Sequence, residues 1–212
     1  MPTVTRPSVT SVDATARGPL LAWRTVDLIT AVMLGVAFGV AYWGWIFAYN
    51  GISLGFAAFA PLGGLLVGPW LLAGTVGGLV VRRPGAALLC EMVAANVEFL
   101  IGNEWGAATM IAGFLQGLGI EIVLAAFRYR RFGWPVVAGG AAVSAVLEGV
   151  YEWSAYYSYW DWTYKLVYLG LFMLSAAVVA GVGGWLLVRA LAATGALDAF
   201  PAGREHRDRH PA

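Results

Sequence analysis

Six stretches of the sequence are mostly apolar over lengths near the ~20 residues that a helix needs to cross a bilayer. They lie at roughly 26–48, 55–82, 84–101, 107–128, 134–157 and 165–188. The second stretch is long and contains Gly68-Pro69, and because proline removes a backbone donor we expect that helix to be kinked or broken there. The pattern predicts an all-α polytopic membrane protein built as a six-helix bundle.

The polar ends of the chain set the domain boundaries. Residues 1–22 contain no apolar core of signal-peptide type and are expected to form a disordered cytoplasmic arm. The membrane domain then covers 23–192, and 193–212 form a polar cytoplasmic tail that holds both histidines, His206 and His210.

Composition supports the membrane assignment and excludes several functions. The chain is 60% hydrophobic and 12% charged, whereas soluble domains carry about 25% charged residues. A net charge of +1 gives no basic patch for nucleic acid. The single cysteine, Cys90, excludes an internal disulfide and a cysteine-based metal cluster. We expect neither a metal nor a cofactor.

The arginines predict the topology. If the N-terminus is inside and 55–82 crosses once, all twelve arginines fall on the inner side and Lys165 alone lies outside. This distribution follows the positive-inside rule. Splitting 55–82 into two spans would place Arg82 and Arg83 outside, so we expect both termini in the cytoplasm.

Five glutamates fall within the predicted spans, where no lysine or arginine is present to neutralise them. A charge at the bilayer centre costs about 2.5–3.5 kcal/mol, so these carboxylates must face the interior or a cavity, or be protonated. Glu91 and Glu98 share one helix face, and Glu148 and Glu152 share another. They lie in the middle and outer half of the membrane, beneath aromatic-rich loops. The layout predicts a cavity open to the outside for a ligand that supplies positive charge or hydrogen-bond donors.

The candidate binding residues are carboxylates, amides and aromatic rings from these segments. Rings stack on a flat ligand, and a cation gains from both π-faces and carboxylates. Structural bonding between helices is the alternative for Glu121, Glu148, Gln116 and Asn96, and an interface belt is the alternative for the aromatic residues. The full set is Glu91, Asn96, Glu98, Trp105, Gln116, Glu121, Glu148, Glu152, Trp153, Trp43, Trp45 and Tyr49.

Small residues at a spacing of four form a ridge on the first predicted helix. Ala31, Gly35 and Gly39 make a small-xxx-small pattern that permits close helix contact. Two interpretations stay open, namely packing within this bundle and docking against another membrane subunit.

Several blocks of sequence carry a family resemblance over about residues 22 to 190. They are "WRTVDLITAVMLGVAFGVAYWGW", "LLVGPWLLAGTVGGLVVRRPGAALLCEMVAANVE", "GNEWG", "QGLGIE" and "FRYRR". In these blocks the chain resembles the substrate-binding (S) components of energy-coupling factor (ECF) vitamin transporters, of the YkoE type.

The resemblance implies a six-helix protein of a bacterial plasma membrane that binds thiamine or its hydroxymethylpyrimidine precursor from outside. It also implies partners: a transmembrane coupling (T) subunit and two cytoplasmic ATPases, so that this chain is not itself an enzyme. The family's docking motif is AxxxA; here Ala31 matches it, Gly35 replaces the second alanine, and Gly39 extends the ridge.

The implied ligand suggests roles for the candidate residues. Glu98 or Glu152 would meet positive charge or the amino group, Asn96 and Gln116 would offer amide bonds, and the aromatic residues would stack.

Two other classes of function remain as alternatives. One is a proton-coupled secondary transporter with a glutamate relay, although the sequence shows no inverted repeat. The other is an intramembrane enzyme using paired carboxylates, although no histidine or metal-ligand set accompanies them in the spans.

Overall fold

The computed structural model describes residues 22–209, so the expected arm falls outside it except for residue 22, as does His210. Every regular element within the described range is helical. The elements are α1 (Thr25–Ser53), η2 (Leu54–Phe56), η3 (Ala60–Leu66), η4 (Gly68–Leu71), α2 (Leu72–Val81), α3 (Ala86–Ile101), α4 (Ala108–Ala126), α5 (Trp134–Ala155), α6 (Trp162–Ser175), η5 (Ala176–Gly183), α7 (Gly184–Ala193) and α8 (Pro201–Arg209).

Five helical stretches in the described range are long and apolar enough to cross a membrane. The last of them runs from Trp162 to Ala193, because α6 continues through the π-helical η5 into α7. The sixth candidate from the sequence, α3, has 16 residues and falls short of that length. The structure therefore shows a polytopic helical protein, and a count of six spans stays a prediction.

The second apolar stretch is not a regular α-helix over its first half. Residues Ala60–Leu66 and Gly68–Leu71 form two 3-10 segments, and α-helical geometry begins at Leu72. Pro69 lies in the second segment, and a proline is tolerated at a helix start because it has no N–H to bond. The α-helix α2 therefore begins inside the apolar layer, where its first backbone amides need partners from other helices.

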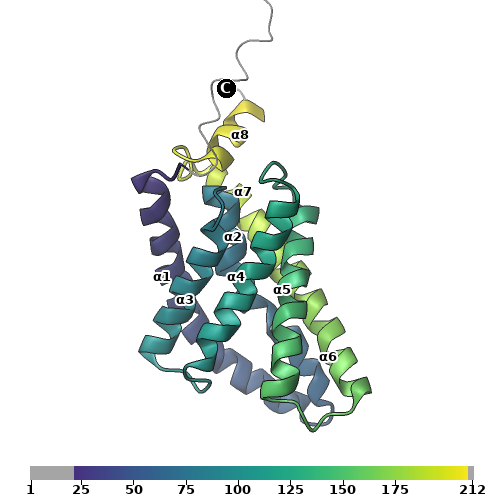
Figure 1. Cartoon of the computed structure of the whole chain (residues 1–212). Helices are drawn as coiled ribbons and strands as arrows, with labels where there is room; N and C mark the ends of the chain where they lie inside the picture. The colour runs from purple at the N-terminus through teal and green to yellow at the C-terminus, as the bar shows by residue number, and fades with distance from the viewer. Residues whose placement is uncertain (1–21, 210–212) are drawn as a thin grey trace, which may run out of the picture.

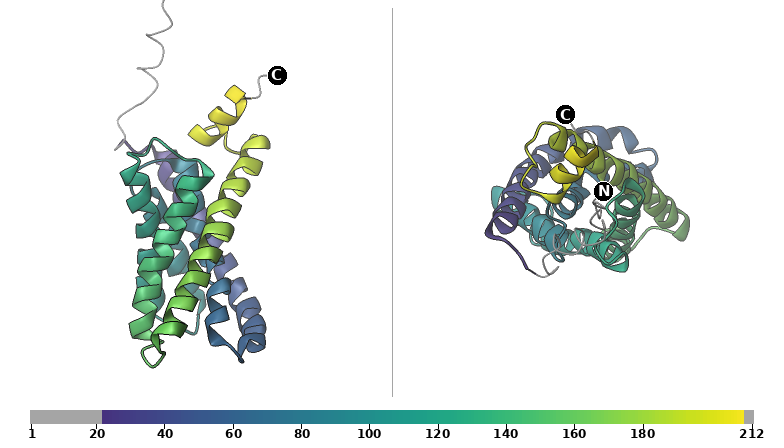
Figure 2. Two further views of the ribbon diagram at one scale, coloured as in Figure 1. Left: turned by 90° about the vertical axis from the view of Figure 1, so that its right-hand side faces the viewer. Right: turned by 90° about the horizontal axis from the view of Figure 1, so that it is seen from above.

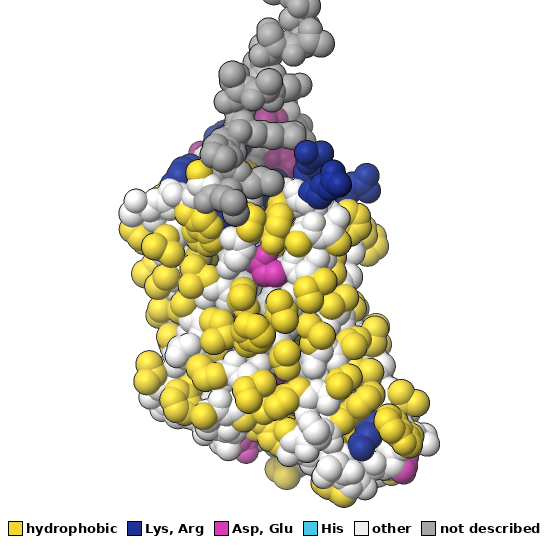
Figure 3. All heavy atoms as spheres, in the orientation of Figure 1, with side chains coloured by type: hydrophobic (Ala, Val, Ile, Leu, Met, Phe, Trp, Pro, Cys, Tyr) yellow, Lys and Arg dark blue, Asp and Glu magenta, His cyan; other side chains and the backbone are white. Residues whose placement is uncertain are grey.

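The helices pack around α2, as Figures 1 and 2 show. Residues Ala73–Val81 of α2 are all buried, and α2 contacts α1, α3, α4, α5 and α7. Consecutive helices α3, α4 and α5 lie side by side. Apolar side chains are spread along the face of the bundle that Figure 3 shows, as expected for helices that face lipid.

The small-residue ridge on α1 lies against α3 within the bundle. An added Cβ at Gly35 would come within 2.6 Å of the Val93 Cβ, and one at Gly39 within 2.6 Å of the Ala94 carbonyl oxygen. Ala31 is fully buried. Packing inside the chain therefore accounts for the ridge. The other interpretation is docking of these residues against another membrane subunit, and such docking would require α1 to separate from α3.

Arginines gather at the end of the bundle where α8 lies (Figures 1 and 3). This "basic end" carries Arg24, Arg82, Arg83, Arg128, Arg130, Arg131, Arg189, Arg204 and Arg207.

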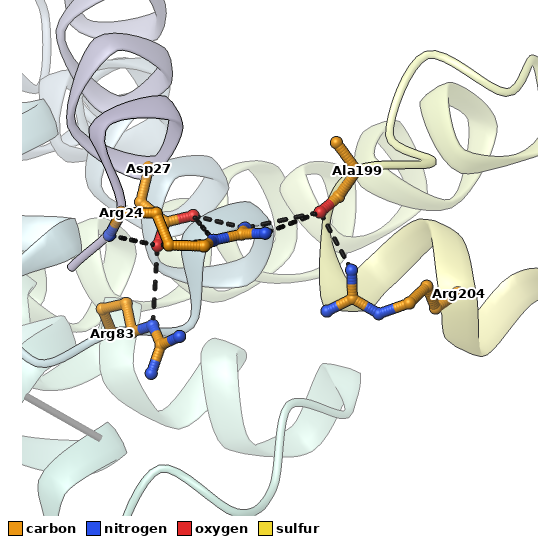
Figure 4. Close-up of polar contacts among 5 residues, drawn as sticks. All are labelled: Arg24, Asp27, Arg83, Ala199 and Arg204. Carbon is orange, nitrogen blue, oxygen red and sulfur yellow. Dashed lines mark hydrogen bonds and ion pairs between the residues drawn. The ribbon is translucent and has the colours of Figure 1, made fainter. Parts of the chain in front are cut away.

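One buried carboxylate ties three segments of the basic end together (Figure 4). Asp27 accepts hydrogen bonds from the backbone and side chain of Arg24 and lies 3.7 Å from the Arg83 Nε. The Arg24 guanidinium also donates to the carbonyl of Ala199, which accepts from Arg204 as well. The start of α1, the turn before α3 and the loop before α8 are thereby joined.

The segment expected as a polar tail contains a packed part. Leu197, Phe200 and Ala202 are buried against α2 and α7 residues such as Leu79 and Val188. The apolar side chains hold α8 at the basic end.

Candidate functional site: an acidic cavity inside the bundle

A cavity of about 230 Å³ lies between the helices, in the half of the bundle away from the basic end. Four glutamates, seven further polar side chains and two tryptophans contribute to its wall, and no lysine or arginine is among the described residues that line it. The lining residues are Tyr42, Tyr49, Val67, Trp70, Glu91, Ala95, Glu98, Trp105, Thr109, Ala112, Gln116, Glu148, Glu152, Tyr156, Tyr157 and Tyr168.

The 3-10 segment η4 contributes one wall of the cavity. Trp70, directly after Pro69, is 7% exposed, and its Nε1 donates to the Glu98 Oε1 over 3.1 Å. The Trp70 ring meets Tyr49 and Trp105 edge to face, at centroid distances of 5.4 and 5.6 Å. The helix break thus turns an indole toward a carboxylate and an aromatic cluster.

The loop between α3 and α4 holds Trp105 at the cavity. Asn103 accepts from the Gly106 amide and donates to the Thr109 hydroxyl, which closes the loop on itself. Gly102 and Gly106 have φ values of 111° and 57°, where residues with a Cβ are disfavoured. This geometry explains the two glycines of "GNEWG" around the tryptophan.

Glu91 completes the start of α2 in the middle of the bundle. Its Oε2 accepts from the Gly74 amide over 2.6 Å, and the Tyr42 hydroxyl accepts from the Ala73 amide over 2.7 Å. These amides are among the donors that a helix start leaves unbonded, and the positive end of the helix dipole favours a nearby carboxylate. The other oxygen of Glu91, Oε1, is buried and has no hydrogen-bond partner among the described residues.

Helix α5 supplies the two remaining carboxylates. Glu148 accepts from the Gln116 amide over 2.8 Å, and Glu152 accepts from the Tyr168 hydroxyl over 2.7 Å. The Glu148 Oε2 is also buried without a partner among the described residues. Because an unsatisfied buried carboxylate oxygen costs free energy, the cavity offers two acceptor positions to a ligand that brings donors.

Tyrosines surround the carboxylates near the end of α5. Burial and the negative charge of Glu152 raise the pKa of Tyr157 above its usual value, and burial and Tyr151 raise that of Tyr156 to about 12. Both hydroxyls therefore stay neutral at physiological pH. Tyr157 stacks on Trp160 at 4.1 Å and meets Tyr168 at 5.1 Å, which extends the aromatic surface beside Glu152.

Seven residues predicted from the sequence line this cavity. They are Tyr49, Glu91, Glu98, Trp105, Gln116, Glu148 and Glu152.

Two other polar candidates lie elsewhere. Asn96 is exposed on the outer face of α3 and donates to the Met92 carbonyl of its own helix. Glu121 is buried near the basic end of α4, where it accepts from the Ala87 amide and from the Tyr129 hydroxyl. Glu121 therefore completes the start of α3, which is the structural interpretation that the sequence left open. Burial and Glu121 raise the pKa of Tyr129, so this hydroxyl remains a donor.

Three of the predicted aromatic residues do not line the cavity. Trp43 packs edge to face on Phe47, and Trp153 does so on Trp162. Trp45 donates to the Leu66 carbonyl. Its ring packs edge to face on the Trp70 ring, with the two ring centroids 6.3 Å apart. The helical period of 3.6 residues explains why these three rings miss the cavity, because residues that are close in sequence point to different faces of a helix.

Several lining residues were not singled out from the sequence. Trp70 lies in the predicted helix break, and a tryptophan beside a proline inside an apolar span is a signal that the sequence does carry. The tyrosines Tyr42, Tyr156, Tyr157 and Tyr168 carry no such signal, because tyrosines are common at membrane interfaces. Nothing in the sequence around Thr109 marks it as a lining residue.

The fold and the cavity define a class: a polytopic membrane protein with an internal, acidic, ligand-sized cavity. Comparisons with known proteins match the chain to membrane transport components. Residues 26–147 match the family model described as "ABC-type cobalt transport system, permease component". The chain is 30% identical to the "Putative HMP/thiamine permease protein YkoE" of Bacillus subtilis (strain 168), over 87% of this chain and 92% of that protein.

A solved structure described as an S-component of an ECF transporter superposes with a TM-score of 0.76. Its sequence identity is 27%, over 89% of this chain and 95% of that one. The chain therefore belongs to the S components of ECF transporters, in the YkoE-type family.

Proposed function

We propose that this chain is the substrate-binding component of an ECF-type importer and binds thiamine or hydroxymethylpyrimidine in the acidic cavity. The observation that carries the proposal is the set of four glutamates around one hollow without a described lysine or arginine in its wall. A relative at 30% identity is named as an HMP/thiamine permease, which supports this ligand class.

The chemistry of the cavity suits an aminopyrimidine. Its amino group is a donor for the unpartnered oxygens of Glu91 and Glu148. The ring lies against aromatic faces such as those of Trp70 and Trp105. The thiazolium of thiamine adds a positive charge, which the carboxylates and π-faces stabilise together. Glu98 and Glu152 are the carboxylates best placed to meet this charge.

The distribution of the arginines supports import from outside to inside as the direction of delivery. The basic end faces the cytoplasm under the positive-inside rule, so the acidic cavity lies in the outer half. A coupling subunit and two ATPases would then supply the energy for import. The lipid bilayer of a bacterial plasma membrane would be a further partner of the chain.

Binding is tested by titrating the purified full-length protein with thiamine and hydroxymethylpyrimidine while tryptophan fluorescence is followed. Two of the tryptophans line the cavity, so quenching at micromolar ligand is expected, and it should weaken in a Trp105→Phe variant. Absence of quenching by both ligands would contradict the proposal.

Transport distinguishes the importer from a proton-coupled carrier with a glutamate relay. We expect uptake into liposomes to require the coupling subunit, the ATPases and ATP. Uptake by this chain alone under a proton gradient would favour the relay instead.

A further inference from the structure

A second cavity, of about 220 Å³, lies at the basic end between the end of α2, the α4–α5 loop, α7 and α8. Its polar wall consists of Arg82, Arg130, Arg189, Glu205 and His206. Its apolar wall consists of Leu79, Phe132, Trp185, Val188, Ala192 and Ala202. The proposed substrate site does not account for this hollow, because it lies at the other end of the bundle.

The charges around this cavity are not balanced. Three guanidinium groups face one carboxylate, and the Arg82 side chain donates to the Glu205 Oε2 over 2.7 Å. Within residues 22–209, Arg130 and Arg189 form no salt bridge. The wall therefore carries an excess of positive charge that an anion can neutralise.

Two of the arginines are held in place by aromatic rings. The Arg82 guanidinium lies 4.6 Å from the centroid of Phe132, and that of Arg189 lies 4.7 Å from the centroid of Trp185. Stacking on a ring fixes the plane of a guanidinium and leaves its edge N–H groups free to donate. Planar guanidinium groups bind phosphate through two parallel hydrogen bonds.

The cavity also lies where charged and apolar surroundings meet. Helix α2 ends at Val81 and α7 at Ala193, beside the arginines. Leu186 and Leu187 on α7 and Trp134 at the start of α5 are exposed, as lipid-facing residues are. An amphipathic molecule could therefore place its polar head among the arginines and its chains along these helices.

We propose that this cavity binds a phosphate group, carried by an anionic phospholipid or free in solution. The group lies between Arg130 and Arg189 and competes with Glu205 for Arg82. The proposal is independent of the substrate that the acidic cavity takes.

The test uses the full-length protein in a neutral detergent, with three ligands in separate arms. Phosphatidylglycerol and phosphatidylcholine are titrated with native mass spectrometry as the readout, and inorganic phosphate with calorimetry. The variant is Arg130→Gln with Arg189→Gln. Its matched control is Arg128→Gln with Arg131→Gln, which removes the same charge from the α4–α5 loop outside the cavity wall.

We expect the double variant to bind phosphatidylglycerol about 30-fold more weakly, given ~1 kcal/mol for each arginine near an anionic lipid. The control should bind as the parent does, and Glu205→Gln should bind more tightly because Arg82 is released. If inorganic phosphate displaces the lipid and binds more weakly to the double variant, free phosphate is a natural occupant of the cavity. If inorganic phosphate does not compete with the lipid, the natural occupant is the lipid headgroup.

Two results would overturn the proposal. One is equal binding of both lipids and of phosphate by the parent, the double variant and the control. The other is weaker lipid binding by Glu205→Gln than by the parent.

Discussion

The indole N–H of Trp70 donates to the Glu98 carboxylate over 3.1 Å, so the break in the second span meets α3 at one wall of the acidic cavity. This bond couples the fold to the site. The 3-10 segment places the ring, and the buried Glu98 carboxylate receives a hydrogen-bond partner inside the bundle.

Removal of this donor should affect both stability and binding. In Trp70→Phe the ring is largely kept but a Glu98 oxygen loses its partner, which costs about 1–3 kcal/mol. We expect a lower melting temperature and weaker thiamine or hydroxymethylpyrimidine binding. Trp45→Phe is the matched control, because its indole bonds to the Leu66 carbonyl outside the cavity wall. If both variants bind ligand like the parent, Glu98 does not contact it.

The two buried glutamates Glu148 and Glu121 should respond differently to the same substitution. Glu148 has an unpartnered oxygen at the cavity, and replacing one oxygen by an amide donor should weaken ligand binding at least tenfold, about 1.4 kcal/mol. Glu121→Gln should lower the melting temperature with little change in affinity, since its partners are the Ala87 amide and Tyr129. Fluorescence titration and thermal unfolding separate the two. Parent-like affinity in Glu148→Gln would argue against this part of the site.

Asn96 provides a negative test of the site. Its side chain is exposed and bonds to the Met92 carbonyl of the same helix. We expect Asn96→Ala to bind ligand with unchanged affinity, whereas Gln116→Ala removes the partner of Glu148 and weakens binding. A large loss in Asn96→Ala would show that α3 rotates from this position when ligand binds.

The close contact of α1 with α3 predicts opposite effects for two glycines on one helix. A Cβ at Gly35 would meet Val93 at 2.6 Å, whereas one at Gly44 meets nothing within 4 Å. Gly35→Ala should destabilise by about 1–3 kcal/mol through overpacking. Gly44→Ala should stabilise by roughly 0.5–1 kcal/mol because alanine loses less backbone entropy. Melting temperatures in detergent measure both. A melting temperature in Gly35→Ala at or above the parent's would mean that α1 moves freely on α3.

The sequence by itself determined the class of protein. Long apolar runs without charge can be accommodated in a bilayer as helices, because a helix satisfies its own backbone. Carboxylates without basic residues at their depth had to face inward, and Glu91, Glu98, Glu148 and Glu152 do line one cavity. Blocks such as "GNEWG" carried the family, which the relatives at 27–30% identity confirm.

The tertiary structure decided which polar residues meet the cavity. Asn96 and Glu98 are two residues apart, yet one faces outward and the other inward, because successive helical positions turn by about 100°. Glu121 bonds across to α3 and Glu148 reaches the hollow, although both are glutamates in apolar helices. Such assignments depend on which helices are neighbours and on how α2 begins at Leu72. Contacts between residues that are distant in the chain decide which helices are neighbours and where α2 begins. The local periodicity of the sequence does not encode these contacts.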